Sequence, residues 1–190
     1  AVKAVDALTG DTFEIKTKMV VNNAGPWVDE VLRDVSGAGK NGNPKFQLSS
    51  AMNLVINRDL MGEYAAGLSG PWHHIFADGR EYNGFRVLFF APWRGKAIIG
   101  TNHLPYNGDA DKFKTTEAEI VDFLKAVNKA HPGADIKREE VSYFYSGFLP
   151  MTGTSPKTGE VKLERHYKLY DHIKTDKVDG IVTVIGVKYT

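Results

Sequence analysis

The sequence contains no cysteine, and this absence excludes two classes of protein. A disulfide-stapled secreted scaffold needs paired cysteines, and a thiolate metal centre needs several of them. No apolar run approaches the roughly 20 residues that a helix needs to cross a bilayer. These absences fit a cytoplasmic protein without a transmembrane segment, and they leave peripheral contact with a membrane open.

A surplus of either charge is also missing. Lysine and arginine total 24 against 23 aspartate and glutamate residues, so the chain lacks the basic excess that nucleic-acid-binding proteins carry. The six histidines show no His-x-His or His-Glu-x-x-His spacing, and we therefore expect no metal site. With 190 residues, of which 42% are hydrophobic, the chain can bury one core and suits one domain with a fringe of a second.

Turn residues and helix signals organise the first part of the chain. Apolar and polar residues alternate around Leu8-Thr9-Gly10-Asp11, which predicts a hairpin with strands over residues 2–7 and 13–21. Pro26 suits the first position of a helix, and residues 37–44 suit a linker after it. The predicted buried stripe of this helix is Trp27, Val28, Val31, Leu32 and Val35.

The middle of the chain is rich in strand signals and contains one clear helix. Thr116 and Glu119 form a capping box, which predicts a helix over residues 116–130. The predicted buried stripe of that helix is Ile120, Val121, Phe123, Leu124 and Val127. We expect strands over residues 46–56, 72–77, 86–93, 97–101, 141–148, 161–171 and 181–187.

This pattern predicts an α+β fold, with a mixed, mostly antiparallel β-sheet covered by helices on one face. The strands at both ends of the chain look like pieces of a second domain. We therefore assign residues 1–43 and 159–190 to that domain and residues 44–158 to a domain inserted between its halves. Chain ends that meet in one place are what a domain inserted between two halves produces.

Two short strings near the ends of the chain share one layout. Val20-Val21-Asn22-Asn23-Ala24-Gly25-Pro26-Trp27 and Val184-Ile185-Gly186-Val187-Lys188-Tyr189-Thr190 each run from an apolar strand into small residues. Small residues at a strand end let the backbone approach a bulky ligand. Both strings resemble the strand ends that hold FAD in glycerol-3-phosphate dehydrogenases and the wider glycine-oxidase-like flavoenzyme group. The resemblance implies FAD contacts at Ala24, Gly25, Trp27, Gly186, Lys188 and Thr190. It also implies that residues 1–43 and 159–190 belong to an FAD-binding domain and residues 44–158 to a substrate-binding domain.

The resemblance comes with one large absence. Flavoenzymes of this group open with a strand, a Gly-x-Gly-x-x-Gly turn and a helix whose N-terminus takes the FAD pyrophosphate. The only glycines among residues 1–25 are Gly10 and Gly25, which are too few and too far apart for that turn. We therefore expect this chain to be an excised piece of a longer enzyme, inactive by itself and unable to bind FAD appreciably by itself.

Further family motifs occur in the middle of the chain, and three of them are altered. Phe89–Thr101 resembles the family's Pro-Trp turn and Gly-Thr strand end, but Asn102 and His103 follow where the family continues with Thr-Asp. Tyr145–Pro150 resembles Tyr-Ser-Gly-x-Arg-Pro, with Leu149 at the arginine position. The family directs that arginine at the substrate phosphate, because a guanidinium donates to two phosphate oxygens. The family's Lys, Gly and His of a third motif are replaced by Ser50, Ala51 and Asn53.

Other residues are candidates for the substrate-binding cation and the acid–base group that these altered motifs lack. Arg165 and Arg86 are the candidate cations for the anionic end of the substrate, and Leu149 is expected to pack beside its carbon chain. Lys188, in the family's Gly-Gly-Lys position, is expected near both flavin and substrate. His103 and His166 are the candidates for acid–base work, because imidazole titrates near neutral pH, and His103 is the one that we assign to catalysis.

The resemblance implies an FAD-dependent glycerol-3-phosphate dehydrogenase-like oxidoreductase. Such an enzyme moves a hydride from the substrate carbinol to the flavin and passes the electrons to a quinone or another acceptor. Leu149 leaves an oxidoreductase of a 2-hydroxy acid or an amine open, whose carboxylate would meet Arg165 or Lys188. A non-catalytic binding module of the same fold is the other alternative.

Overall fold

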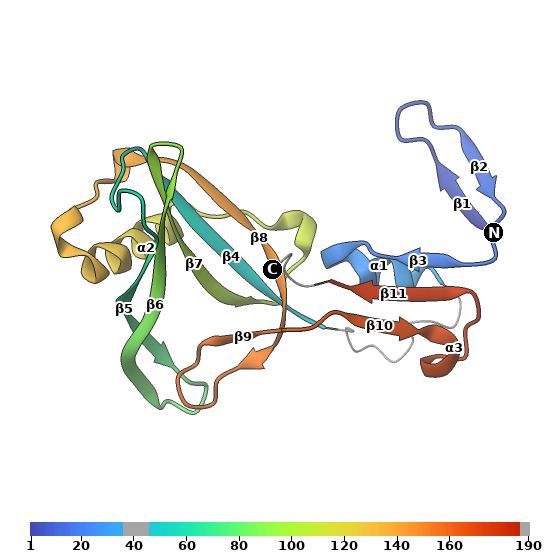
Figure 1. Cartoon of the computed structure of the whole chain (residues 1–190). Helices are drawn as coiled ribbons and strands as arrows, with labels where there is room; N and C mark the ends of the chain where they lie inside the picture. The colour runs from blue at the N-terminus through green and yellow to red at the C-terminus, as the bar shows by residue number, and fades with distance from the viewer. Residues whose placement is uncertain (36–45, 187–190) are drawn as a thin grey trace. The chain divides into compact units, whose positions relative to one another are not determined.

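The computed structural model describes residues 1–35 and 46–186, which form two compact units (Figure 1). Unit 1 comprises Ala1–Lys45 and Arg165–Thr190, and unit 2 comprises Phe46–Glu164. The expected linker at residues 37–44 lies outside the described residues. The second boundary falls later than the expected 158/159, because the strand at Val161–Leu163 pairs within unit 2.

Unit 2 is built on a six-stranded antiparallel sheet in the order β5-β6-β7-β4-β8-β9 (Figure 1). Its strands are β4 (Gln47–Ile56), β5 (Ala66–Ile75), β6 (Glu81–Trp93), β7 (Lys96–Tyr106), β8 (Val141–Thr154) and β9 (Val161–Leu163). Short 3-10 turns lie at Ala110–Lys112, Pro132–Ala134 and Arg138–Glu140. Most of these strands extend beyond the ranges expected from the sequence. Pairing with a neighbouring strand holds residues of low β-propensity in the extended conformation.

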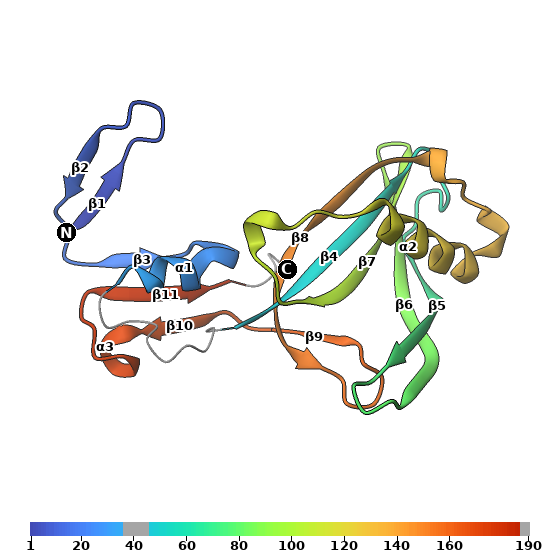
Figure 2. The ribbon, with the colours of Figure 1, turned by 180° about the vertical axis from the view of Figure 1, so that it is seen from behind.

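One long helix, α2 (Glu117–Ala130), covers one face of this sheet, and the view from behind in Figure 2 shows it on β5 to β7. Thr116 caps it as expected: its hydroxyl accepts from the Glu119 amide, and the Glu119 carboxylate accepts from the Thr116 amide. The helix residues in the core are Ile120, Phe123, Leu124 and Val127. Val121 is only half-buried, because it lies on the flank of the apolar stripe.

Strand alternation divides the side chains of the sheet between two faces. Met52 and Leu54 enter the core with α2, so Ser49, Ala51 and Asn53 lie on the opposite face. We call that side the open face. The β4 register brings His103 of β7 opposite Ala51, and Leu149 and Tyr145 of β8 opposite Ser49 and Asn53.

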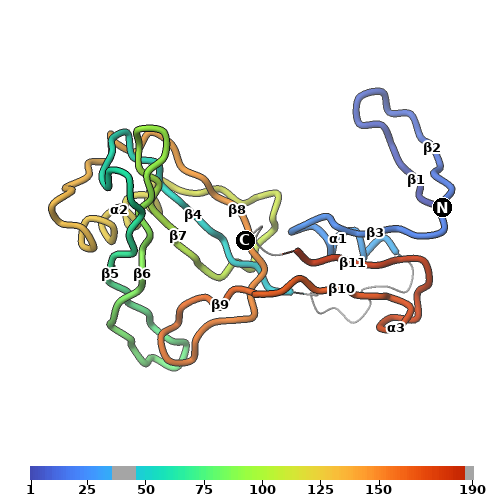
Figure 3. Tube along the Cα trace, in the orientation of Figure 1, coloured from blue at the N-terminus to red at the C-terminus, as the bar shows by residue number. Residues whose placement is uncertain are grey.

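Unit 1 contains a three-stranded sheet in the order β10-β11-β3, formed from the two ends of the chain. Its strands are β3 (Val20–Asn22), β10 (Lys168–Asp171) and β11 (Ile181–Ile185), with a 3-10 turn at Gly25–Trp27 and helices α1 (Val28–Arg33) and α3 (His172–Thr175). β11 pairs antiparallel with β10 and parallel with β3. The tube in Figure 3 follows the chain from β10 through α3 and back along β11.

Three expected elements of unit 1 differ in the structure. The strand expected at 13–21 is broken, because β2 (Thr12–Ile15) pairs with β1 (Val2–Val5) while β3 joins the other sheet. The strand expected at 161–171 is likewise two strands in different sheets, β9 and β10. In the first helix, Val28 and Leu32 are buried, but Trp27 and Val31 are more than a third exposed.

The α+β prediction is confirmed: the sheets are mostly antiparallel, with one parallel pair, and a helix covers one face of the larger sheet. No helix among the described residues is both long and apolar enough to span a bilayer.

Candidate functional site

The carboxyl ends of β3 and β11 lie at one edge of the unit 1 sheet. The two strands are parallel neighbours, with Val20 opposite Ile181 and Asn22 opposite Thr183. Ligands bind at the carboxyl edge of parallel strands, where the following loops leave the sheet. Ala24 and Gly25, which follow β3, and Gly186, which follows β11, are therefore brought to the same edge. We call it the cofactor edge.

Bare backbone marks the cofactor edge at two points. Gly25 has φ +58°, a left-handed conformation that glycine adopts without strain. A Cβ added at Gly25 or at Gly186 would meet no heavy atom within 4 Å. Both positions are thus open, as the approach of a flat ring system such as flavin requires. Trp27 is 38% exposed beside them, and the candidates Lys188 and Thr190 lie outside the described residues.

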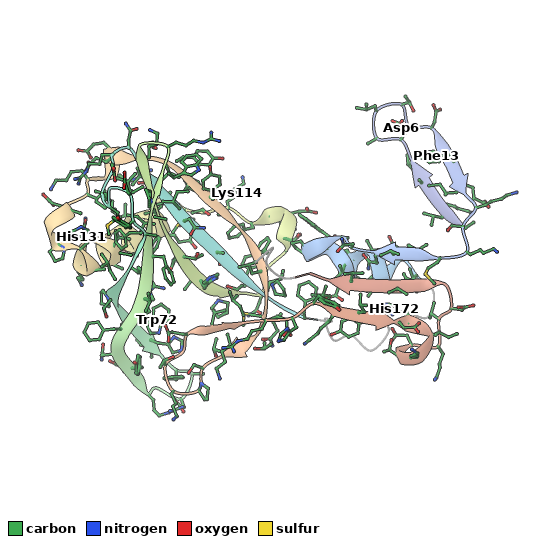
Figure 4. The ribbon with its side chains drawn as sticks, viewed as in Figure 1. Asp6, Phe13, Trp72, Lys114, His131 and His172 are labelled. Carbon is green, nitrogen blue, oxygen red and sulfur yellow. The ribbon has the colours of Figure 1, made fainter. Side chains whose placement is uncertain are left out.

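A buried chain of hydrogen bonds lies behind the cofactor edge. The Asn22 amide donates to the Val28 carbonyl at 2.9 Å and to the Thr183 hydroxyl at 3.3 Å. The Thr183 hydroxyl lies 2.8 Å from His172 Nε2, and His172 Nδ1 contacts the Asp176 carboxylate. Figure 4 labels His172 within unit 1. This chain ties β3, α1, β11 and α3 together, and it holds the strand end that leads to Gly25.

The open face of unit 2 carries the acid–base candidate. His103 Nδ1 lies 3.4 Å from the hydroxyl of Ser49, a residue without solvent exposure. Leu149 pairs with Ser49 from the other side. The structure therefore brings His103 and Leu149 to one region of the sheet, with Ser49 between their strands.

The next position along β4 on the open face belongs to Asn53. Its carbonyl oxygen accepts from the Thr101 hydroxyl at 3.0 Å. A Cβ on Gly100 would collide with the Asn53 side chain, so only glycine fits there. Exposed aromatic residues continue the face: Phe89 is 62% exposed and Tyr145 is 44% exposed.

Arg86 lies on the other side of the same sheet. Its guanidinium donates to Asn102 Oδ1 at 2.8 Å and lies over the rings of Trp72 and Phe123, 4.6 and 5.8 Å from their centroids. Burial lowers the pKa of Arg86 from its ordinary value, and Glu160 opposes that shift. Cation–π contacts of this kind stabilise packing between a sheet and a helix. Alternation along the strands thus separates Arg86 from His103 and Leu149.

Arg165 opens the second segment of unit 1 and has an exposed side chain. Among residues 1–35 and 46–186, no group of three histidine, aspartate or glutamate side chains could hold a metal ion. Ser49, Asn22 and His172 are buried polar residues of these sites that were not expected from the sequence. Polar residues within apolar strand runs were the available signal for Ser49 and Asn22, whereas nothing in the sequence marked His172 as buried.

The profile of the FAD dependent oxidoreductase family matches residues 1–186. The chain belongs to that family. Among curated relatives of this FAD dependent oxidoreductase chain, the glycerol-3-phosphate dehydrogenase of Synechocystis sp. is 31% identical over 199 residues, which cover 100% of this chain and 33% of the relative. The aerobic glycerol-3-phosphate dehydrogenase of Staphylococcus haemolyticus is 29% identical over 192 residues, covering 100% of this chain and 30% of that protein.

A solved structure with a similar fold supports this membership. It is the glycerol-3-phosphate dehydrogenase from Bacillus halodurans complexed with FAD, with a TM-score of 0.60 and 23% identity. The likeness covers 98% of this chain and 32% of that chain. The chain thus spans about a third of the length of the curated relatives that it matches.

Proposed function

We propose that this chain works within a longer FAD-dependent oxidoreductase that oxidises glycerol-3-phosphate. Unit 2 supplies the substrate-binding sheet, and unit 1 supplies strands of the cofactor domain. The observation that carries the proposal is the cofactor edge, where Gly25 and Gly186 follow two parallel strands and each presents bare backbone. The family match and the names of the curated relatives support the same chemistry.

Each cofactor-binding candidate has a proposed role, including Lys188 and Thr190, which lie outside the described residues. FAD, when bound, supplies an acceptor for the hydride that leaves the substrate carbinol. Ala24, Gly25 and Gly186 let the backbone approach the ring, and Trp27 and Thr190 contact it. Lys188 contributes a positive charge, which stabilises the negative charge that develops during reduction. The electrons then pass to a quinone or another acceptor, and the protein works in the cytoplasm or at a membrane surface.

The substrate anion needs a cation, because Leu149 occupies the position of the family's arginine. Arg165 is the cation that we propose for the phosphate, since its side chain is exposed whereas the Arg86 side chain is half-buried on the α2 face of the sheet. Leu149 then packs beside the carbon chain of the substrate. His103 takes the hydroxyl proton.

A steady-state assay of the full-length flavoenzyme carrying this chain tests the proposal. Turnover of glycerol-3-phosphate, with lactate, 2-hydroxyglutarate and glycine left unchanged, is the expected result. Arg165→Gln should raise KM for glycerol-3-phosphate at least about tenfold, because a charge-assisted contact is lost. Arg80→Gln, which removes an exposed arginine paired with Asp78, is the matched control.

Two other outcomes would identify the alternatives. Turnover of a carboxylate alone would favour an oxidoreductase of a 2-hydroxy acid or an amine, for which Leu149 is the supporting observation. A full-length protein that carries no flavin and turns over none of the four compounds would favour a non-catalytic binding module.

A further inference from the structure

Thr115 carries a hydroxyl that is buried within unit 2. Among residues 1–35 and 46–186, its Oγ1 atom has no hydrogen-bond partner. The residue lies in the segment that leads from β7 to α2, directly before the helix cap Thr116. A buried hydroxyl without a partner costs free energy, so such groups in proteins bind a water molecule or another ligand. The surroundings of Thr115 determine which ligand fits.

Thr115 lines a small cavity between this segment and the sheet. The cavity has a volume of about 10 Å³, which is near the space that one water molecule requires. Four of the residues around it are polar: Ser50, Asn102, Thr115 and Glu119. A cavity with a purely apolar lining stays empty, whereas a polar cavity with several hydrogen-bonding groups holds water. Both the size and the lining of this cavity therefore suit a single water molecule.

The polar neighbours of Thr115 can each form a further hydrogen bond. The Arg86 guanidinium donates to Asn102 Oδ1 at 2.8 Å. Because a guanidinium only donates, this contact identifies the amide oxygen and leaves the Asn102 nitrogen as a donor. The Ser50 hydroxyl donates to the Leu104 carbonyl at 3.3 Å, so its oxygen can accept a hydrogen bond. Together with the Thr115 hydroxyl, these groups offer two donors and one acceptor.

We propose that this cavity is a binding site for one water molecule, which accepts from Asn102 and Thr115 and donates to Ser50. A buried water molecule typically makes about three hydrogen bonds, and this set supplies that number. The water connects β4, through Ser50, and β7, through Asn102, with the segment that precedes α2.

A metal ion suits these groups less well than water does. The Asn102 nitrogen presents protons to the cavity, and protons repel a cation. The carboxylate at the cavity, that of Glu119, already accepts from the Thr116 amide at 2.7 Å and from the Thr116 hydroxyl at 2.8 Å. In the described part of the chain, no three histidine, aspartate or glutamate residues gather in a way that could hold a metal. A neutral ligand that both donates and accepts fits best.

Asn102 extends the role of this water beyond the cavity. It occupies a position where the family continues with threonine. Its longer side chain reaches Arg86, whose guanidinium lies over the rings of Trp72 and of Phe123 in α2. β7 therefore contacts the helix through Arg86 and, with the water, also contacts Thr115 at the start of the helix. The water thus belongs to the attachment of α2 to the sheet.

Crystallography of the full-length protein tests the proposal directly. The parent should show a water molecule within about 2.5–3.0 Å of Thr115 Oγ1. Thr115→Ser keeps the hydroxyl and should retain the water, whereas Thr115→Val has nearly the same shape without a hydroxyl and should lose it. An empty cavity in the parent, a metal ion in it, or a direct hydrogen bond from Thr115 to a protein acceptor would each overturn the proposal.

Relaxation dispersion of ¹⁷O counts long-lived internal water molecules in solution and gives a second test. Thr115→Val should have one such water fewer than the parent. Thr12→Val, at an exposed threonine of β2, is the matched control and should leave the count unchanged. Equal counts in Thr115→Val and the parent would refute the site. This measurement needs neither flavin reduction nor substrate, so its outcome is separate from that of the proposed function.

Discussion

His172 Nε2 lies 2.8 Å from the Thr183 hydroxyl, and both side chains are completely buried. Asp176, which accepts from Nδ1, is a carboxylate without a proton to donate, so Nδ1 carries the imidazole proton. In a neutral imidazole Nε2 accepts from Thr183, and the Thr183 oxygen accepts in turn from the Asn22 amide at 3.3 Å. Every polar group in this chain is therefore used, and each one depends on the next.

Replacing His172 should lower the stability of the fold, because its hydrogen-bond partners depend on it. His172→Ala leaves Thr183 and Asp176 without their shared partner and opens a cavity, so we expect the free energy of unfolding to fall by about 2–4 kcal/mol. His166→Ala, at an exposed histidine, should change it by less than about 0.5 kcal/mol. Urea denaturation of both variants measures the difference. Coincident midpoints would show that the hydrogen-bonded chain adds nothing to stability.

The capping box of α2 gives a second prediction. Thr116→Ala removes the acceptor for the Glu119 amide at the start of the helix. We expect a loss of about 1 kcal/mol in the free energy of unfolding. Thr116→Ser keeps the hydroxyl and should retain most of that stability. If alanine and serine variants unfold at the same denaturant concentration, the cap is not a stabilising element.

Acid should weaken unit 2 through Glu117. A hydrogen bond from Arg138 lowers the pKa of Glu117 below its ordinary 4.5. A carboxylate whose folded pKa is depressed stabilises the fold above its unfolded pKa, and that contribution disappears as the pH falls through the folded pKa. Glu117→Gln should therefore flatten the decline of unfolding free energy below pH 4.5. Arg138→Gln should flatten it equally, and unchanged slopes in both variants would contradict the assignment.

The two glycines of the cofactor edge should separate stability from cofactor binding. Gly25→Ala places a Cβ at φ +58°, which we expect to cost about 1–2 kcal/mol of stability. Gly186→Ala adds a Cβ that meets no atom within 4 Å, so stability should hold. In the full-length enzyme, both variants should lower flavin occupancy, measured by absorbance after purification. Full occupancy in Gly186→Ala would remove that residue from the cofactor edge.

Lys188 is tested through turnover. Lys188→Ala in the full-length enzyme should lower kcat at least about tenfold, because the charge proposed to stabilise the reduced flavin is lost. Lys174→Ala, which removes an exposed lysine paired with Asp171, should leave kcat unchanged. Unchanged flavin reduction in Lys188→Ala would eliminate this role.

The sequence predicted best those elements that are stabilised by interactions between residues close in sequence. α2 was predicted with its cap and four of its buried residues because helical periodicity and capping act within a few turns. β5 was predicted only in part, because Gly67, Gly70 and Pro71 have low β-propensity. Pairing with β6 nevertheless places them in the strand. The break between β9 and β10 depends on which sheet each strand joins, and no local signal at residues 164–167 marks it.

The candidate site shows the same limit. His103 was a candidate because of its residue type, but its contact with Ser49 depends on the register between β4 and β7. A shift of one residue would send Ser49 to the α2 face. The separation of Arg86 from Leu149 follows from alternation along paired strands, which requires knowing the order of strands in the sheet.

The parallel pairing of β3 and β11 also constrains the order of folding. Asn22 and Thr183 are 161 residues apart in sequence, and the whole of unit 2 lies between them. During synthesis, unit 2 is complete before β11 leaves the ribosome. Unit 2 can therefore fold before β11 is available to pair with β3. A folded unit 2 shortens the flexible segment that must close to bring the strands together, which lowers the entropic cost of that closure. A folded unit 2 thus favours the pairing of β3 with β11.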